Sequence, residues 1–224
     1  MELFLVPTPV GNLGDMTYRA VEILQSVDVI LCEDTRTSSV LLKHYQINKP
    51  LTPYHQHNEH KIVQHLVDQI LAGKSFALIT DAGTPGISDP GFLLLRECHK
   101  NNIKVTCLPG ATAFVPALVQ SGLPCNQFVF EGFLPIKKGR QTAMRSFIEE
   151  ERTIILYESP HRIARTLKEL AIILGENREA AVVREISKKF EETHKGTLAS
   201  LAVFFESHPA KGEIVLVVGS GPKK

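Results

Sequence analysis

The sequence lacks most features that mark secreted, membrane or metal-binding proteins. No apolar run is long enough to span a bilayer, and Glu2 and Pro7 interrupt any signal-peptide pattern, so we expect no membrane association. The formal net charge is only +1, so any RNA contact must come from local basic patches. Four scattered cysteines without a C-x-x-C pair favour a reduced, cytoplasmic protein over a disulfide-linked one: Cys32, Cys98, Cys107 and Cys125.

The 224 residues, 43% of them hydrophobic, show a regular alternation of short apolar segments and amphipathic helical patterns. This alternation is typical of an α/β protein with a mostly parallel sheet. The breaker-rich stretch 121–124 predicts an N-terminal α/β domain at 1–120, a C-terminal α/β domain with a mixed sheet at 121–224, and a cleft between them. The predicted strands are 3–6, 27–32, 76–79, 103–108, 128–131, 153–157, 180–184, 190–194 and 214–218.

Capping residues predict where the helices begin and end. One helix has two adjacent i,i+4 rows, Ile62/Leu66/Ile70 and Val63/Val67/Leu71, and Gly73 should end it. The other predicted boundaries are Asp15 as the cap of a helix through Leu24, Thr37 or Ser38 as a helix start, Asp89 as a cap with Pro90 at the first helical position, and Ser159-Pro160 and Gly175 at the two ends of a later helix.

The stretch from Thr80 to Gly91 is the strongest local signal in the chain. Three glycines and two prolines in twelve residues exclude an ordinary helix or strand interior. The stretch follows a predicted strand, and open α/β sheets place their ligands at the carboxyl ends of strands. We therefore interpret it as a ligand-binding loop rather than a structural turn.

Charged residues gather after three other predicted strands. A solvated, salt-bridged surface would explain one such group, but strand ends converge on one edge of a sheet. Lys137, Lys138, Arg140 and Arg145 add a basic loop whose positive potential suits a phosphate backbone. The three strand-end groups are Glu33, Asp34 and Arg36; Tyr157, Glu158, His161 and Arg162; and Arg184, Glu185, Lys188 and Lys189.

Three other chemistries fit the sequence poorly. The spacing Gly11-x-x-Gly14 departs from the G-x-G-x-x-G of dinucleotide-binding folds, although Glu33-Asp34 follows at a suitable interval. Ser88 and Ser159 lack the G-x-S-x-G elbow of serine hydrolases. The histidines at 55, 57, 60 and 65 have no cysteine or H-E-x-x-H pattern beside them, so we expect no metal site.

Taken together, seven motifs in this order resemble those of the tetrapyrrole methylase superfamily of class III S-adenosylmethionine (AdoMet) methyltransferases, and within it the enzymes that methylate small-subunit ribosomal RNA. The resemblance covers essentially the whole chain. The motifs are Pro7–Asp15, Glu33–Arg36, Asp81–Gly91, Pro109–Ala113, Glu131–Pro135, Tyr157–Arg162 and Arg184–Glu192.

The resemblance implies a homodimer that binds AdoMet in the interdomain cleft of each subunit. It also implies methylation of the 2′-hydroxyl of a cytidine in the decoding region of 16S rRNA, with the assembled small ribosomal subunit as substrate. No metal is implied. The cofactor-binding residues implied are Pro9, Val10, Gly11, Asp81, Ala82, Gly83, Thr84, Ala111, Thr112, Tyr157 and Gly212.

The expected reaction is a direct displacement in which the ribose oxygen attacks the sulfonium methyl group, so the protein has to align the two reactants. A carboxylate could take the hydroxyl proton, and Glu33, Asp34, Glu158 and Glu185 are all candidates. Phosphate contacts to a splayed-out nucleotide are expected from Arg36, Arg162, Arg184, Lys188, Lys189, Lys137 and Lys138.

Two other interpretations remain open at the level of sequence. One is a tetrapyrrole or diphthine-type methyltransferase on the same scaffold. The other is a non-catalytic RNA-binding module that has kept a nucleotide-binding fold.

Overall fold

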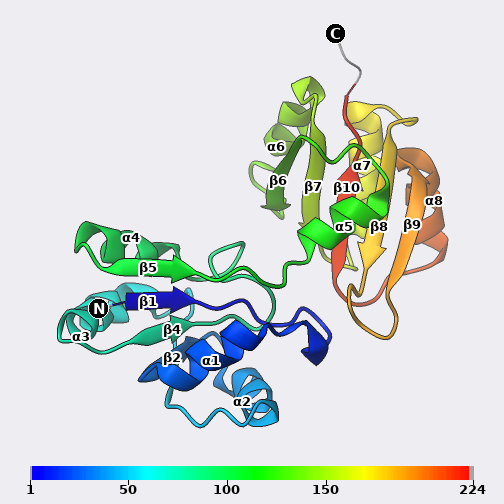
Figure 1. Ribbon diagram of the computed structural model, residues 1–224. Coiled ribbons are helices and arrows are strands. Elements are labelled where there is room, and N and C mark those ends of the chain that lie inside the picture. Colours follow the sequence, from blue (N-terminus) through cyan, green and yellow to red (C-terminus); the bar gives the residue numbers. More distant parts are fainter. Residues whose placement is uncertain (1, 222–224) are drawn as a thin grey trace. The chain divides into compact units, whose positions relative to one another are not determined.

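The computed structural model describes residues 2–221, which divide between Thr112 and Ala113 into two compact α/β units. Each unit is built on its own five-stranded sheet (Figure 1). The first unit holds β1 (Glu2–Leu5), the 3-10 helix η1 (Leu13–Asp15), α1 (Tyr18–Ser26), β2 (Val29–Cys32), α2 (Thr35–His44), β3 (Leu51–Pro53), α3 (Glu59–Leu71), β4 (Phe76–Leu78), α4 (Phe92–Lys100) and β5 (Lys104–Cys107).

The second unit begins with a helix and continues through a mixed sheet. Its elements are α5 (Phe114–Ser121), β6 (Phe128–Phe133), α6 (Arg140–Ser146), the 3-10 helix η2 (Phe147–Glu149), β7 (Thr153–Glu158), α7 (Ile163–Leu174), β8 (Glu179–Arg184), β9 (Glu192–Thr197), α8 (Leu198–Ser207) and β10 (Ile214–Val218). None of the helices within residues 2–221 of either unit has the length and apolar character that crossing a bilayer requires.

The first sheet is entirely parallel, in the order β3-β2-β4-β1-β5. Helices α1 and α2 cover one face through Leu24 and Leu42, and α3 and α4 cover the other through Ile70 and Leu94 (Figure 1). The central neighbours β1 and β4 therefore send their connections to opposite faces. In open α/β sheets the loops at such a position form the ligand-binding crevice.

The second sheet is mixed, in the order β6-β7-β10-β8-β9. Because β10 runs antiparallel to β7 and β8, the carboxyl ends of β6, β7 and β8 meet the start of β10 at one edge. Helices α7 and α8 cover one face through Leu167 and Leu201, whereas α5 covers part of the other through Ala117 and Leu118. One edge of this sheet thus collects several loops.

The predicted α/β class is confirmed, and all nine predicted strands are present within one to three residues of their expected bounds. The sequence missed β3, because it is three residues long, contains Pro53 and has no apolar alternation. The units divide before α5, whereas the sequence placed the domain junction after residue 120. The reason is that Ala117 and Leu118 of α5 pack against the second sheet.

Four predicted helix starts are wrong, and one of them is that of α7, which begins at Ile163 after Arg162 and not at Ser159-Pro160. Thr17 caps α1 with its side chain, and Asp15 instead ends the preceding 3-10 helix. Asp34 caps α2, so this helix starts at Thr35, two or three residues before the predicted start at Thr37 or Ser38. Helix α4 starts at Phe92 after Gly91, whose φ of 148° lets the loop turn into the helix, so Asp89 and Pro90 lie in the loop. Of the predicted rows on α3, Leu66, Val67 and Ile70 are buried but Leu71 is exposed.

The close approach of Gly110 to Pro7 gives a test of the first unit. A Cβ atom at position 110 would lie 2.7 Å from Cβ of Pro7, whose ring has no alternative rotamer. We expect Gly110→Ala to lower the free energy of unfolding by about 1–3 kcal/mol, measured by urea denaturation. Gly14→Ala is the matched control, because its Cβ would meet only the Asn12 side chain, which can move. Equal stability of the two variants would contradict the close packing.

Candidate functional site

The loops after β1 and β4 are joined at the carboxyl edge of the first sheet. Thr8 and Gly83 form an isolated antiparallel bridge, with each backbone N–H donating to the other residue's carbonyl over 2.9 Å. The buried Thr8 hydroxyl donates to the carbonyl of Thr80 over 2.9 Å. These bonds hold the Pro9–Gly11 turn against the Asp81–Thr84 loop, so the two main predicted cofactor-binding segments lie together.

The loop after β5 joins the same cluster. The Thr84 hydroxyl donates to the carbonyl of Ala111 over 3.1 Å, and the Cβ position of Gly83 lies 3.9 Å from that oxygen. Gly83 has a φ of 84°, which favours glycine, so its backbone can adopt this turn without a side chain in the way. Three predicted segments separated by up to a hundred residues therefore form one backbone-rich surface.

A cavity of about 400 Å³ opens between these loops and α2. Its lining is mixed: Leu13, Val40 and Leu41 supply apolar surface, and Thr37 and Asp81 supply polar groups. The remaining lining residues are Thr8, Pro9, Gly11, Ser38 and Thr80. Cavities of this size with a few polar groups on an apolar wall are typical small-molecule sites.

Three carboxyl groups interact at this edge: Glu33, Asp81 and Asp89. Desolvation raises the pKa of Glu33, and the charge of Asp81 adds to the rise. Desolvation also raises the pKa of Asp81, although the backbone N–H of Asp34 stabilises its carboxylate. Asp89 has its pKa raised to about 7, first by desolvation and then by the charges of Glu33 and Asp81. Desolvation, and after it the charges of Glu33 and Asp81, therefore favour the protonated form of Asp89 up to about neutral pH.

Asp34 differs from these three carboxyl groups because it is paired. Its Oδ1 accepts from the backbone N–H of Arg36 over 2.8 Å, and its Oδ2 accepts from Nη2 of Arg36 over 2.7 Å. The hydrogen bonds from Arg36 lower the pKa of Asp34 to about 2. Asp34 is thus a helix cap and the partner of Arg36, whose guanidinium remains exposed to solvent.

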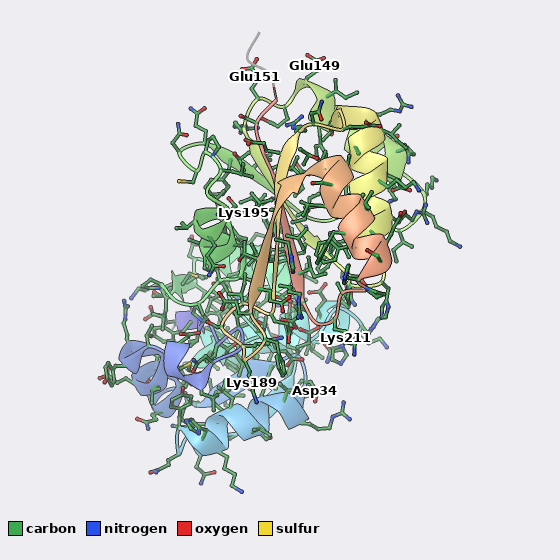
Figure 2. All side chains as sticks on the ribbon, turned by 90° about the vertical axis from the view of Figure 1, so that its right-hand side faces the viewer. Asp34, Glu149, Glu151, Lys189, Lys195 and Lys211 are labelled. Carbon is green, nitrogen blue, oxygen red and sulfur yellow. The ribbon has the colours of Figure 1, made fainter. Side chains whose placement is uncertain are left out.

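The predicted residues of the second unit lie at one edge of its sheet. Tyr157 and Glu158 end β7, Arg184 ends β8, and Gly212 precedes β10. Figure 2 shows Lys189 and Lys211 at one end of this unit and Glu149 and Glu151 at the opposite end.

Glu158 lies at the centre of a buried ion-pair network. Its Oε1 is 2.6 Å from Nη2 of Arg162, and its Oε2 accepts from the Thr166 hydroxyl over 2.6 Å. Arg140 donates to that hydroxyl and, through Nε, to Glu169 over 2.8 Å. The network ties α7 to the loop after β6, so Glu158 and Arg162 hold the fold of this edge together.

Glu185 and Lys188 form a second, more open network. The Glu185 carboxylate accepts from the backbone N–H of Glu213 and from Lys188, both over 3.0 Å, and these bonds lower its pKa. Lys188 also pairs with the Glu213 carboxylate over 3.0 Å. A Cβ atom on Gly212 would lie 2.2 Å from the Glu185 carboxylate, so only glycine allows this contact.

The other predicted residues of the second unit differ in whether their side chains are paired, packed or exposed. Arg184 is engaged, since it donates to Glu192 over 2.9 Å and to the carbonyl of Lys211 over 3.2 Å. Lys189 lies over the ring of Phe190, and Lys137 and Lys138 are exposed without an ion-pair partner in the part of the chain that the structure describes. Tyr157 packs against Phe130 and Phe133 with ring centroids 5.0 and 5.5 Å away.

Within residues 2–221, no group of three or more His, Cys, Asp or Glu side chains could hold a metal ion.

Sequence reasoning missed Asp89, Arg140 and Thr166. The sequence predicts Asp89 as a helix cap and gives no sign that its carboxyl group interacts with Glu33. Arg140 was grouped with surface lysines, although its side chain is only 4% exposed. No pattern in the sequence distinguishes a buried arginine from an exposed one, because the Glu158–Thr166–Arg140 contacts join three separate elements.

These features define an α/β protein with a cavity at the carboxyl edge of a parallel sheet. The model of the family Tetrapyrrole (Corrin/Porphyrin) Methylases matches residues 2–202, and the chain belongs to this family. The fold agrees: the structure of uroporphyrin-III C-methyltransferase from Thermus thermophilus complexed with S-adenosylhomocysteine superposes with a TM-score of 0.69 at 18% identity, covering 98% of this chain and 97% of that one. Diphthine synthase gives a TM-score of 0.76 at 13% identity, covering 98% and 90%.

Within the family, several similar curated proteins carry the same name. Ribosomal RNA small subunit methyltransferase I of Synechocystis sp. is 51% identical over 99% of this chain and 80% of its own length. The protein of that name from Escherichia coli O157:H7 is 44% identical over 97% of this chain and 77% of its own length. The resemblance inferred from the seven motifs is confirmed.

Arg140 and Arg165 both pair with Glu169, but replacing them should change the free energy of unfolding by very different amounts. Arg140→Ala would remove the buried cation beside Glu169 and the donor to the Thr166 hydroxyl that binds Glu158, and we expect a loss of about 3–5 kcal/mol in the free energy of unfolding. Arg165→Ala is the matched control: its side chain is 69% exposed, so we expect less than about 1 kcal/mol. Urea denaturation measures both, and similar losses would contradict a buried role for Arg140.

The raised pKa of Asp89 predicts a pH-dependent stability. A carboxyl with a folded-state pKa near 7 contributes stability that is fully present below its unfolded-state pKa and is lost as the pH rises to about 7. Asp89→Asn should therefore stabilise the protein at pH 8 relative to wild type by about 1–2 kcal/mol, a value reduced because the group is only partly buried.

The same comparison at pH 4 is the control. There the wild-type carboxyl is protonated in the folded state, so the two proteins should differ little. Denaturation at both pH values measures the effect, and a pH-independent difference would refute the assignment.

Proposed function

We propose that the protein transfers a methyl group from AdoMet to the ribose 2′-hydroxyl of a cytidine in the decoding region of 16S rRNA. The observation that carries this proposal is the joining of the Pro9–Gly11, Asp81–Thr84 and Ala111 segments at one sheet edge, in a chain whose 44–51% identical relatives are named as methyltransferases of small-subunit rRNA.

The residues at the first edge fit AdoMet. The cavity of about 400 Å³ offers apolar surface from Leu13 and Val40 for a flat base, and backbone groups of Pro9–Gly11 for polar edges. The Asp81 carboxyl at the same cavity suits a ligand that carries a sulfonium cation. When bound, AdoMet supplies an activated methyl group. The full proposed set in the first unit is Pro9, Val10, Gly11, Asp81, Ala82, Gly83, Thr84, Ala111 and Thr112, and the family resemblance also implies Tyr157 and Gly212.

Among the four candidate bases, the environment favours Glu33. Asp34 is held by Arg36 with a pKa of about 2, Glu185 is held by Lys188, and Glu158 is buried in its network. No hydrogen bond or ion pair within residues 2–221 reaches the Glu33 carboxylate, and its pKa is raised. A general base works best when its pKa approaches the working pH, so Glu33 takes the proton from the attacking hydroxyl.

The RNA would be held by exposed cations. Lys137, Lys138, Lys189 and Arg36 have their charged groups toward solvent, so they can reach phosphates. Arg162, Arg184 and Lys188 are engaged with carboxylates, and they act by keeping the loops of the second edge in place. The proposal includes a homodimer, a cytoplasmic location and the assembled small subunit as substrate.

Methyl transfer to defined acceptors tests the proposal. The wild-type protein is incubated with tritiated AdoMet and unmethylated small ribosomal subunits, free 16S rRNA, or a tetrapyrrole, and ribose-methylation mapping locates the product. We expect label in the small subunits, at a cytidine ribose. Label in the tetrapyrrole alone would support the alternative methyltransferase, and calorimetry without AdoMet binding would support a non-catalytic module.

The role of Glu33 gives a kinetic prediction. Glu33→Gln should lower kcat by about 10²-fold or more, because the amide cannot accept the hydroxyl proton, while the Kd of AdoMet by calorimetry stays within about threefold. Asp34→Ser is the matched control, since serine also caps helices, and we expect kcat within about fivefold of wild type. A Glu33→Gln variant with normal kcat would exclude the base role.

A further inference from the structure

An irregularity in β6 changes the direction of one aromatic side chain. Phe130 pairs with Ile155 of β7, but Gly132 pairs with Leu156, so Glu131 is an extra residue in the strand. Gly132 has a φ of 65°, the left-handed conformation that such a bulge requires. In a regular strand, residues three apart point to opposite faces. Because of the bulge, Phe130 and Phe133 both contact Tyr157 on the face that carries α5.

The aromatic side chains on this face form a continuous row. Phe114 of α5 contacts Phe130 at 4.7 Å between ring centroids, Phe130 contacts Tyr157 at 5.0 Å, and Tyr157 contacts Phe133 at 5.5 Å. Phe133 is the end of this row and its side chain is 56% exposed. In a regular strand, Phe133 would point toward the opposite face of the sheet, which α7 and α8 cover. The bulge instead leaves the Phe133 ring partly exposed to solvent and in contact with Tyr157.

The chain that follows Phe133 carries unpaired positive charge. Leu134 is buried, and Arg140 fixes the far end of the loop by donating to the carbonyl of Pro135 and to Glu169. Between these two anchored points, Lys137 and Lys138 are exposed and form no ion pair with any described residue. The exposed ring of Phe133 thus lies four and five residues before the exposed ammonium groups of Lys137 and Lys138, on a loop that is anchored at both ends.

We propose that Phe133 stacks against a nucleobase of the substrate RNA, with Lys137 and Lys138 on the adjoining phosphates. Aromatic rings beside basic loops are the usual platform for single-stranded nucleic acid, because each base has a flat face and each linkage a negative charge. The inference rests on the proposed function. It adds a residue that binds the substrate and takes no part in the chemical step.

The charge of the loop favours RNA over the adenine of the cofactor as the stacked base. AdoMet has no phosphate, and its sulfonium is a cation that Lys137 and Lys138 would repel. A polynucleotide gains from the same lysines. The occupant of Phe133 should therefore be an RNA base.

Steady-state methyl transfer to unmethylated small ribosomal subunits tests the inference. Phe133→Leu keeps the apolar bulk and removes the ring plane, and we expect KM for the subunits to rise about tenfold with kcat within about twofold. Phe133→Tyr restores the plane and should return KM to within about twofold of wild type. Phe128→Leu is the matched control, because Phe128 is 39% exposed at the other end of the same strand, and its KM should be unchanged.

Several outcomes would overturn the inference. KM of Phe133→Leu equal to wild type excludes stacking. A tenfold weaker Kd for AdoMet by calorimetry in this variant assigns the ring to adenine instead, and a smaller sedimenting species assigns it to contact with a second copy of the chain. A wild-type protein that binds AdoMet but transfers no methyl group to any RNA refutes the proposed function, and the inference with it. Wild-type transfer with a normal Phe133→Leu variant refutes the inference alone.

Discussion

The backbone bridge between Thr8 and Gly83 is the constraint on which the first site depends. It joins loops that leave the two central strands of a parallel sheet toward opposite faces, and neither loop has regular structure of its own. A single pair of 2.9 Å bonds, with the Thr8 hydroxyl on Thr80, gives these loops a common position. The bridge requires a residue without a side chain at position 83, where φ is 84°. Gly11 and Gly83 leave backbone groups accessible at this edge, beside a cavity whose wall also carries side chains such as Leu13 and Asp81.

The second unit fixes its loops by a different physical means. Its edge collects the ends of strands that run in both directions, and buried or half-buried ion pairs connect them. The Glu158 carboxylate is the clearest case, since Arg162, Thr166 and the backbone N–H of Ser159 all bind it. Burying these charges is costly and is offset only when every partner is in place. The charged residues of this edge are therefore divided into a paired set that maintains the loops and an exposed set, including Lys137 and Lys138, that is available to a ligand.

The fold could be predicted from local patterns because most strands of the two sheets are short apolar runs and most helices have apolar stripes, whereas β9 is polar and its predicted bounds differ by two and three residues. The exception was β3, which has three residues and a proline. The candidate site was predicted less completely. Glycines and prolines mark the Thr80–Gly91 loop in the sequence, but the Asp89 interaction with Glu33 joins a loop to a strand end more than fifty residues away. Likewise Arg140 and Phe133 look like ordinary residues of a loop and a strand. Their burial and direction are set by Glu169 and by the bulge at Gly132, which are tertiary features.

The electrostatics of the two edges agree with the two ligands of the proposed reaction. Desolvation raises the pKa values of Glu33, Asp81 and Asp89, and the charges of nearby carboxylates add to the rise, so negative charge at this edge is costly without a positive ligand. A sulfonium-bearing donor would lower this cost, whereas an RNA phosphate would increase it. The second edge carries Lys189 and Lys211, at the end of its unit away from Glu149 and Glu151 (Figure 2). Phosphates would be stabilised there, and a cationic donor would not. The carboxyl groups of the first edge therefore favour the cationic methyl donor of the proposed reaction, and the exposed lysines of the second unit favour RNA phosphates.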